Sequence, residues 1–102
     1  MPRKFKVVIS PLLTEDLQKI VNYYKEVTKN HKIGRKFLRE TKRKILLLET
    51  NALQYEVKYH SVRCVKINSF PYRIHFIVDE LEKSVYVMGV FGTSELPRNW
   101  ER

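Results

Sequence analysis

The fold is decided by the stretch Ser61–Phe91, SVRCVKINSFPYRIHFIVDELEKSVYVMGVF. Within it, apolar side chains recur at every second position in three segments, a period typical of β-strands with one buried face. The predicted strands cover about residues 61–68, 70–78 and 84–91. The connections around NSFP and DELEK are short, which indicates hairpins. Three consecutive strands joined in this way predict an antiparallel sheet.

The same alternation assigns a buried face and an open face to these strands. The inward positions are Val65 and Ile67 in the first strand, Tyr72, Ile74, Phe76 and Val78 in the second, and Val85, Val87 and Phe91 in the third. Because neighbouring residues in a strand point to opposite faces, Lys66, Arg73 and His75 are predicted to lie together on the open face. Cys64 is predicted to lie beside them.

The residues before this sheet predict a strand and then a helical hairpin. In FKVVI, residues 5–9, the odd-numbered side chains share one face. SPLLTED then indicates a helix start, with Ser10 as N-cap, Pro11 first in the helix, and Glu15 and Asp16 in the first turn. The first helix ends near Thr28, and its buried stripe at helical spacing is Leu13, Leu17, Ile20, Val21 and Tyr24. A second helix covers about residues 33–50, and its buried stripe is Phe37, Leu38, Thr41, Ile45 and Leu48.

The order β-α-α-β-β-β predicts an α+β fold, with the helical hairpin packed on one face of a mostly antiparallel four-stranded sheet. NALQYEVKYH, residues 51–60, is less regular and is expected to loop back to the sheet. A length of 102 residues, without repeats or linkers, predicts a single domain over residues 1–102.

Composition narrows the function classes. The net charge of +9 predicts attraction to DNA, RNA or an acidic protein, whereas the alternative is a solvated basic surface. The sequence has no run of about 18 apolar residues, so no membrane span is predicted. The N-terminus lacks the features of a signal peptide. Cys64 is the single cysteine, and His31 and His60 are expected in loops without ligand partners. We therefore expect a cytoplasmic protein without a disulfide, metal site or cofactor.

The second helix has a basic face opposite its buried stripe. Basic residues cluster there at 100° per residue: Lys32, Arg35, Arg39, Lys42 and Arg43. Leu46 points into the same face. One interpretation is that the helix end passes under the chain, so that Leu46 joins the core. The other is that this face is a docking site for an acidic, partly apolar partner segment.

The open sheet face suggests a second candidate site. Lysine and arginine bind phosphate, and a histidine can move a proton, so Lys66, Arg73 and His75 together have the groups to polarise and cut a phosphodiester. The plainer interpretation is that His75 is an exposed strand residue. Cys64 has the basic neighbours Arg63 and Lys66, which are expected to lower its pKa, although no partner pattern marks it as a nucleophile.

The whole chain resembles the RelE/ParE superfamily of toxins from bacterial type II toxin–antitoxin modules, and its ParE-like branch in particular. The resemblance rests on VVISPLLTEDLQKIVNYY (residues 7–24), the basic second helix, VRCVKINSFPYRIHFIVDE (62–80) and VYVMGVFGTSELPRNW (85–100). It implies a plasmid-stabilisation type of toxin that a cognate acidic antitoxin neutralises by wrapping it, with operator DNA contacted only through the antitoxin. The basic helix face with Leu46 suits such a partner.

The resemblance implies one of two targets. RelE-like members are ribosome-dependent mRNA endonucleases that need no metal, whereas ParE-like members block DNA gyrase without cleavage chemistry. Arg73 matches the strand arginine widely seen in the family, and Lys66 matches a basic position of the nucleases. Cys64 stands where such nucleases can have another lysine. A third alternative is a non-toxic basic nucleic-acid-binding domain.

The C-terminal stretch departs from both branches. Nucleases have an arginine, or a histidine with a tyrosine, near residues 92–95, and ParE-like relatives carry a histidine and an arginine around this stretch. This chain has Gly92 and Glu95, which favours the gyrase inhibitor over the nuclease and leaves open an attenuated toxin. Pro97 and Trp100 are predicted to form a structural plug over apolar surface.

Overall fold

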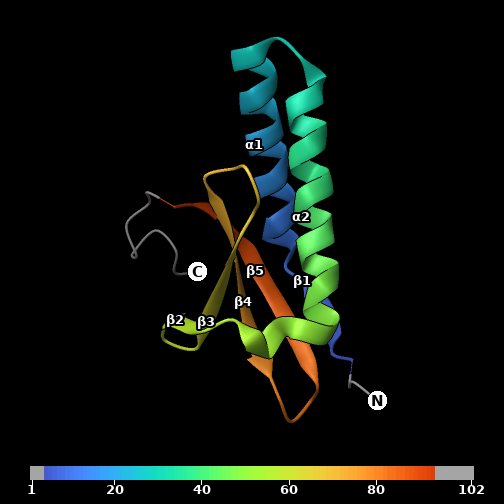
Figure 1. Cartoon of the computed structure of the whole chain (residues 1–102), viewed down its shortest axis with the longest axis vertical. Helices are drawn as coiled ribbons and strands as arrows, with labels where there is room; N and C mark the ends of the chain where they lie inside the picture. The colour runs from blue at the N-terminus through green and yellow to red at the C-terminus, as the bar shows by residue number, and fades with distance from the viewer. Residues whose placement is uncertain (1–3, 94–102) are drawn as a thin grey trace.

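Local signals in the sequence start both helices of the computed structural model, which describes residues 4–93 (Figure 1). Ser10 Oγ accepts a hydrogen bond from the Leu12 N–H at 3.1 Å, and α1 covers Pro11–Thr28. Asn30 caps α2, His31–Asn51, in the same way at 2.8 Å. The second helix therefore begins two residues before the predicted start and includes His31, which the sequence suggested for a loop.

The first turn of α1 contains no acidic residue, so the prediction for Glu15 and Asp16 is wrong in its detail. Both residues follow in the next turn. Asp16 turns out to have a tertiary role instead, because its Oδ2 accepts a hydrogen bond from the Val90 N–H at 3.3 Å. That contact ties α1 to the last strand of the sheet.

The described residues form one five-stranded sheet in the order β1-β5-β4-β3-β2. The remaining elements are β1 Lys6–Ile9, the short 3-10 helix η1 Ala52–Gln54, β2 Val57–Tyr59, β3 Val62–Lys66, β4 Tyr72–Asp79 and β5 Ser84–Gly92. β1 lies parallel to β5, and the other neighbours are antiparallel. The predicted α+β class and helix pair are confirmed. The predicted strand count was one too low, because β2 is three residues long with an irregular register and is too short to show alternation.

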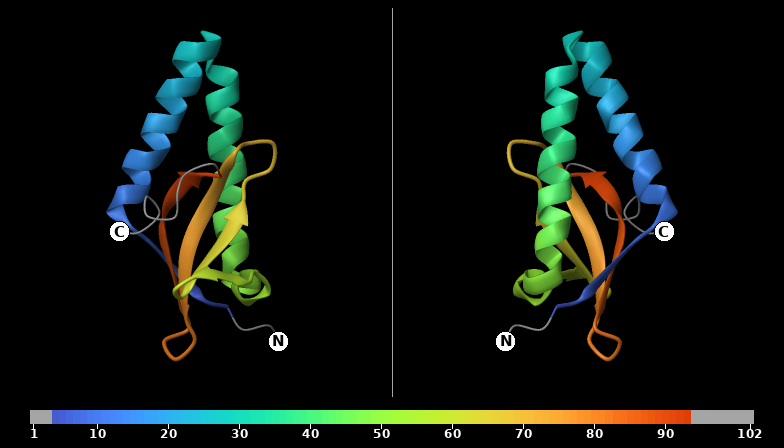
Figure 2. Two further views of the ribbon diagram at one scale, coloured as in Figure 1. Left: turned by 90° about the vertical axis from the view of Figure 1, so that its left-hand side faces the viewer. Right: turned by 90° about the vertical axis from the view of Figure 1, so that its right-hand side faces the viewer.

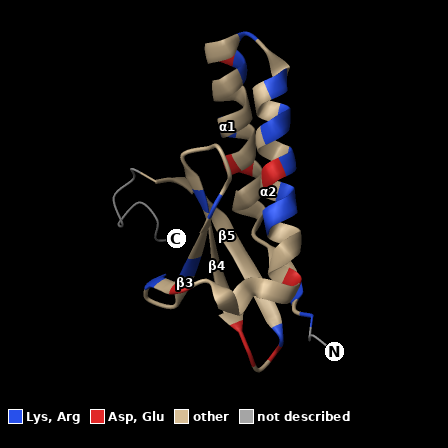
Figure 3. Ribbon diagram, viewed as in Figure 1, with Lys and Arg blue, Asp and Glu red and all other residues tan. Residues whose placement is uncertain are grey.

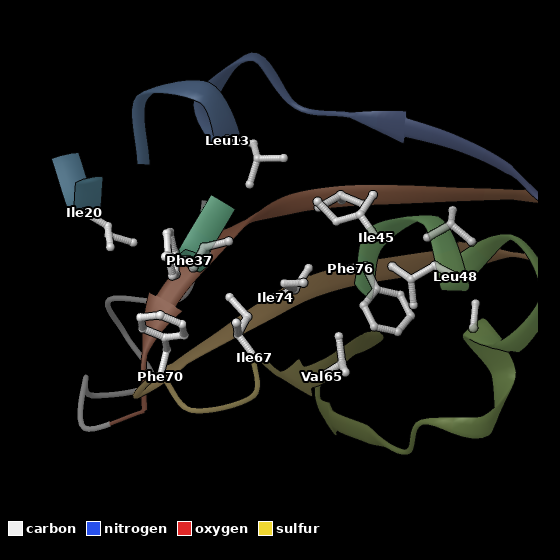
Figure 4. Packing of buried hydrophobic residues seen from close by; sticks show 14 of the residues in the cluster. Leu13, Ile20, Phe37, Ile45, Leu48, Val65, Ile67, Phe70, Ile74 and Phe76 are labelled. Atoms are coloured by element: carbon white, nitrogen blue, oxygen red, sulfur yellow. The ribbon is translucent and has the colours of Figure 1, made fainter. Parts of the chain in front are cut away.

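Both helices cover one face of the sheet, and the main core lies between these two layers (Figures 2 and 4). Phe37 of α2 is fully buried and meets the rings of Phe70 and Tyr72 edge-on, with centroid distances of 5.2 and 5.6 Å. Thr41 is buried one turn later, and its hydroxyl is satisfied by donating to the Phe37 carbonyl at 2.8 Å. The stripe predicted for α2 is therefore the buried face, except that Leu38 is only half-buried.

A β-bulge changes the face of the end of β5. The β4–β5 register shifts between His75 and Phe76, so that Gly89 pairs with His75 while Val87 pairs with Phe76. The extra residue reverses the inward and outward positions that follow it. Val90 therefore joins the main core, and Phe91 lies on the opposite face with Arg73. The prediction that Phe91 shares a face with Val85 was wrong for this reason.

The first strand is less buried than its alternation indicates. Phe5 is buried, and its N–H donates to the carbonyl of Glu49 in α2 at 2.8 Å. Val7 packs against the core, but Ile9 is half-exposed at the edge of the sheet. Helix α2 ends close to the beginning of β1, so only the first part of this strand is covered.

Candidate functional site

The outer face of α2 forms a shallow groove of about 550 Å³, called the α2 groove here. Its lining residues are Arg35, Leu38, Arg39, Lys42, Arg43 and Leu46. The five residues that the sequence suggested for partner binding thus line one surface. Leu38, which periodicity assigned to the core, is half-buried and supplies a second apolar wall.

Leu46 is 65% exposed, which decides between its two interpretations. The prediction that it joins the core is wrong, because the neighbouring core positions of α2 are filled by Ile45 and Leu48. An exposed leucine on its own is ordinary, but this one stands in a groove with a second leucine and four cations. The α2 groove therefore combines two apolar side chains with four basic ones.

The charges of the α2 groove are weakly compensated. Figure 3 shows Lys and Arg along the first two-thirds of α2, up to Lys44, with Glu40 as the single acidic residue among them. In the part of the chain that the structure describes, the one groove residue with a salt bridge is Arg43, whose Nε lies 3.8 Å from Glu40 Oε2. A contact this long, from a largely exposed Arg43 to a half-buried Glu40, neutralises little charge. The groove consequently presents a positive field to an approaching anion.

The outer face of the sheet brings two of the three predicted catalytic residues side by side. Lys66 of β3 pairs in register with Arg73 of β4, so their side chains leave the same face of the sheet. Lys66 is exposed and Arg73 is half-buried. Two adjacent cations on an accessible face are suited to holding a phosphate or a carboxylate.

His75 lies on this same face but is fully buried, so the open position predicted for it is wrong. The plainer interpretation of an exposed strand residue is wrong as well. Its Nδ1 is 3.1 Å from the hydroxyl of Tyr59, and the ring of Phe91 stands edge-on to the imidazole at 4.8 Å. Strand alternation correctly gives the face of His75, but Tyr59 comes from a strand 16 residues away that the sequence pattern did not reveal.

Cys64 sits directly opposite His75 on β3 and is also buried. Burial raises the pKa of this thiol, although the positive charges of Arg73 and Lys58 act in the opposite direction. The predicted lowering of the pKa was wrong, because desolvation of the thiolate outweighs its attraction to nearby cations. Cys64 is therefore a protonated thiol at neutral pH rather than a nucleophile.

The remaining predictions concern a metal site and the C-terminal residues. Among residues 4–93, no cluster of three or more His, Cys, Asp or Glu side chains is placed to hold a metal ion. Gly92 ends β5, whereas Glu95, Pro97 and Trp100 lie outside the described residues.

Neither of the two described helices is long and apolar enough to cross a membrane.

The α-helical hairpin on a mostly antiparallel sheet, with a basic outer helix, defines a small α+β domain. The fold matches a solved structure described as the chromosomal ParDE TA system from P. aeruginosa, with a TM-score of 0.74. That match covers 87% of this chain and 96% of the other at 16% identity, so it supports the fold alone. No curated protein sequence gave a significant match.

The family itself is established by a match over residues 7–97 to the family described as ParE toxin of type II toxin-antitoxin system, parDE. Because this match spans nearly the whole chain, the protein belongs to the ParE toxin family.

Proposed function

We propose that this ParE-family protein is a toxin that inhibits an essential protein target by binding it, and that DNA gyrase is this target. We further propose that a cognate acidic antitoxin neutralises it by occupying the α2 groove. The observation that carries the antitoxin proposal is the groove itself, where Leu38 and Leu46 lie among four cations that have little internal compensation. An amphipathic segment with carboxylates beside apolar residues complements both properties.

The state of the outer sheet face favours an inhibitor over a nuclease. A cleavage mechanism needs a group that accepts a proton at the reacting phosphate. His75 is fully buried beneath Tyr59 and Phe91, and the neighbouring Cys64 is a protonated thiol. The face therefore keeps cations that hold an anion but lacks an accessible acid–base group at His75.

A metal-independent, ribosome-dependent mRNA endonuclease is the second candidate. It is favoured by the register pair of Lys66 and Arg73, which is accessible and suited to a phosphate. Both candidate targets lie in the cytoplasm, where the protein would act. Operator DNA would be contacted only through the antitoxin. A third candidate is a non-toxic or attenuated basic domain, which would have no effect on growth.

Inducing the chain without its antitoxin tests the toxin proposal. Growth arrest is expected, and purified protein should inhibit DNA supercoiling by gyrase while leaving ribosome-bound mRNA intact. If gyrase still supercoils DNA and mRNA is cut in the ribosomal A site, the protein is a nuclease and not a gyrase inhibitor. In that case Arg73→Ala should abolish the cutting. Unimpaired growth at good expression would leave the non-toxic domain as the surviving candidate.

The antitoxin proposal is tested at Leu46. The first step is to find a short acidic reading frame next to this gene and to purify its product. Leu46→Glu should weaken binding at least tenfold, because it puts a carboxylate into an apolar contact that its partner flanks with carboxylates. Leu81→Glu is the matched control, since Leu81 is 95% exposed in the β4–β5 turn. Equal affinity of both variants would place the antitoxin elsewhere.

A further inference from the structure

A second group of buried side chains lies on the outer face of the sheet, opposite the helices. Both helices pack on the other face, where the main core lies (Figure 2). Cys64 of β3, His75 of β4 and Phe91 of β5 are nevertheless only 7%, 0% and 5% exposed. Antiparallel sheets with helices on one side commonly leave the other face to water, with polar and accessible side chains. The burial of these three residues therefore needs a cover on the outer face.

Neighbouring rings account for part of this burial. The Tyr59 hydroxyl lies 3.1 Å from Nδ1 of His75, and the ring of Phe91 stands edge-on to the imidazole at 4.8 Å. These two rings shield the imidazole from its sides. Phe91 is itself almost completely buried, so the cover must extend over its ring as well.

The other end of the same face is open. Ile77 lies two residues beyond His75 in β4 and is half-buried, and its register partner Tyr86 is 42% exposed. A shallow groove of about 280 Å³ at this end is lined by Ser10, Leu12, Ile77, Tyr86 and Met88. Along β4 and β5, deep burial on the outer face is thus confined to the end at which β5 finishes.

The chain leaves the sheet beside this buried end. β5 ends at Gly92, and the Thr93 N–H donates to the carbonyl of Pro71 at 2.9 Å, next to the start of β4. Residues 94–102, with the sequence SELPRNWER, follow from this point and contain the single tryptophan of the chain, Trp100. A large apolar side chain therefore lies a short distance along the chain from the buried group.

The length of this segment suits a return over the outer face. Trp100 comes seven residues after Thr93, and seven residues span at most about 23 Å. His75 pairs with Gly89, four residues before Thr93, so it lies about 13 Å back along the sheet. The segment is therefore long enough to turn back and place Trp100 over His75, with residues to spare for the turn.

We propose that residues 94–102 fold back over the outer face of the sheet, with the indole of Trp100 packed against Phe91 and above His75. A tryptophan supplies the large apolar area that such a cover needs, and Pro97 favours a turn on the way. This location gives the structural plug predicted from the sequence its place in the fold. It also closes the face on which a nuclease would act, and it does not depend on the proposed function.

The fluorescence of Trp100 tests where the segment lies. In the purified full-length protein, its emission should be blue-shifted from that of the urea-unfolded chain and protected from quenching by acrylamide. Phe91→Leu should shift the emission to the red, because it removes the ring against which the indole packs. The matched control is Tyr86→Leu, the same change at the open end of the same strand, which should leave the emission unchanged.

The single thiol of the chain, Cys64, gives an independent measurement. Its reaction with DTNB in native buffer should be about tenfold faster in Trp100→Ser than in wild type, because loss of the cover exposes the thiol. Arg102→Ser, in the same segment, should react like wild type. Ile45→Val lowers stability from the main core and shows how far global unfolding alone speeds up the reaction.

Several results would overturn the proposal. Trp100 lies elsewhere if its emission equals that of the unfolded chain, or if Tyr86→Leu shifts the emission and Phe91→Leu does not. The segment does not cover Cys64 if Trp100→Ser reacts no faster than Ile45→Val. An emission maximum that changes on dilution would assign the cover to a second copy of the chain. Circular dichroism verifies the folding of each variant, and the thiol measurement provides the decision if Phe91→Leu does not fold.

Discussion

Adding one methyl group at Gly89 should have an unusually large effect on stability. A Cβ on this residue would lie 2.6 Å from Asp16 Oδ2 and 3.3 Å from the ring of Phe91. The first distance is shorter than any stable contact between these atoms. Asp16 cannot simply rotate away, because the same oxygen accepts the Val90 N–H at 3.3 Å. The Gly89→Ala protein must therefore lose this hydrogen bond or shift β5 away from α1.

The cost can be worked out from these two contributions. A weakened hydrogen bond to a partly buried carboxylate costs about 1 kcal/mol, and overpacking a buried site costs a further 1–3 kcal/mol. We expect Gly89→Ala to lower the free energy of unfolding by about 2–4 kcal/mol. For a domain of this size, that corresponds to a fall in Tm of about 10–20 °C. The general preference of strands would instead predict that Gly89→Ala raises the free energy of unfolding, because glycine destabilises a strand relative to alanine.

A double-mutant cycle identifies the cause. Asp16→Ala alone should cost about 1 kcal/mol, and adding Gly89→Ala to it should cost less than 1 kcal/mol more, because the clashing oxygen is gone. Urea unfolding followed by circular dichroism measures all four proteins. Equal costs of Gly89→Ala with and without Asp16, or a Gly89→Ala cost below about 0.5 kcal/mol, would refute the reasoning.

Three further predictions concern stability and the buried thiol. Phe37→Ala should cost about 3–5 kcal/mol in urea unfolding, because the fully buried ring meets two other aromatic rings; a cost of 1 kcal/mol would contradict the packing. Lys29→Gly should raise the free energy of unfolding by about 0.5–1 kcal/mol, because Lys29 ends α1 at φ 56°, and an unchanged urea midpoint would argue against strain there. Burial raises the pKa of Cys64, so the thiol ionises at a higher pH in the folded protein than in the unfolded chain. Its contribution to stability is therefore complete below the unfolded pKa. That contribution is lost as the pH rises through the folded pKa. Wild type should therefore lose more stability than Cys64→Ala as the pH rises above the unfolded thiol's pKa of about 8.5, and parallel pH profiles would exclude this contribution.

The sequence by itself determined most local features of this protein. Ser10 and Asn30 cap the helices through hydrogen bonds to residues two positions away, and such contacts depend only on neighbouring residues. The core stripe of α2 and the strand character of residues 72–79 follow from side-chain periodicity. The basic outer face of α2 follows from the same helical periodicity, since residues opposite the buried stripe face solvent.

Tertiary structure decided the features that depend on distant partners. The bulge in β5 moved Phe91 to the outer face, and a period-two pattern cannot reveal one extra residue. The parallel pairing of β1 with β5 joins segments about 80 residues apart. His75 shows the consequence for the candidate site most clearly. Its face was predictable from alternation, but its burial depends on Tyr59 and Phe91, which reach it only through strand pairing that the local sequence does not encode.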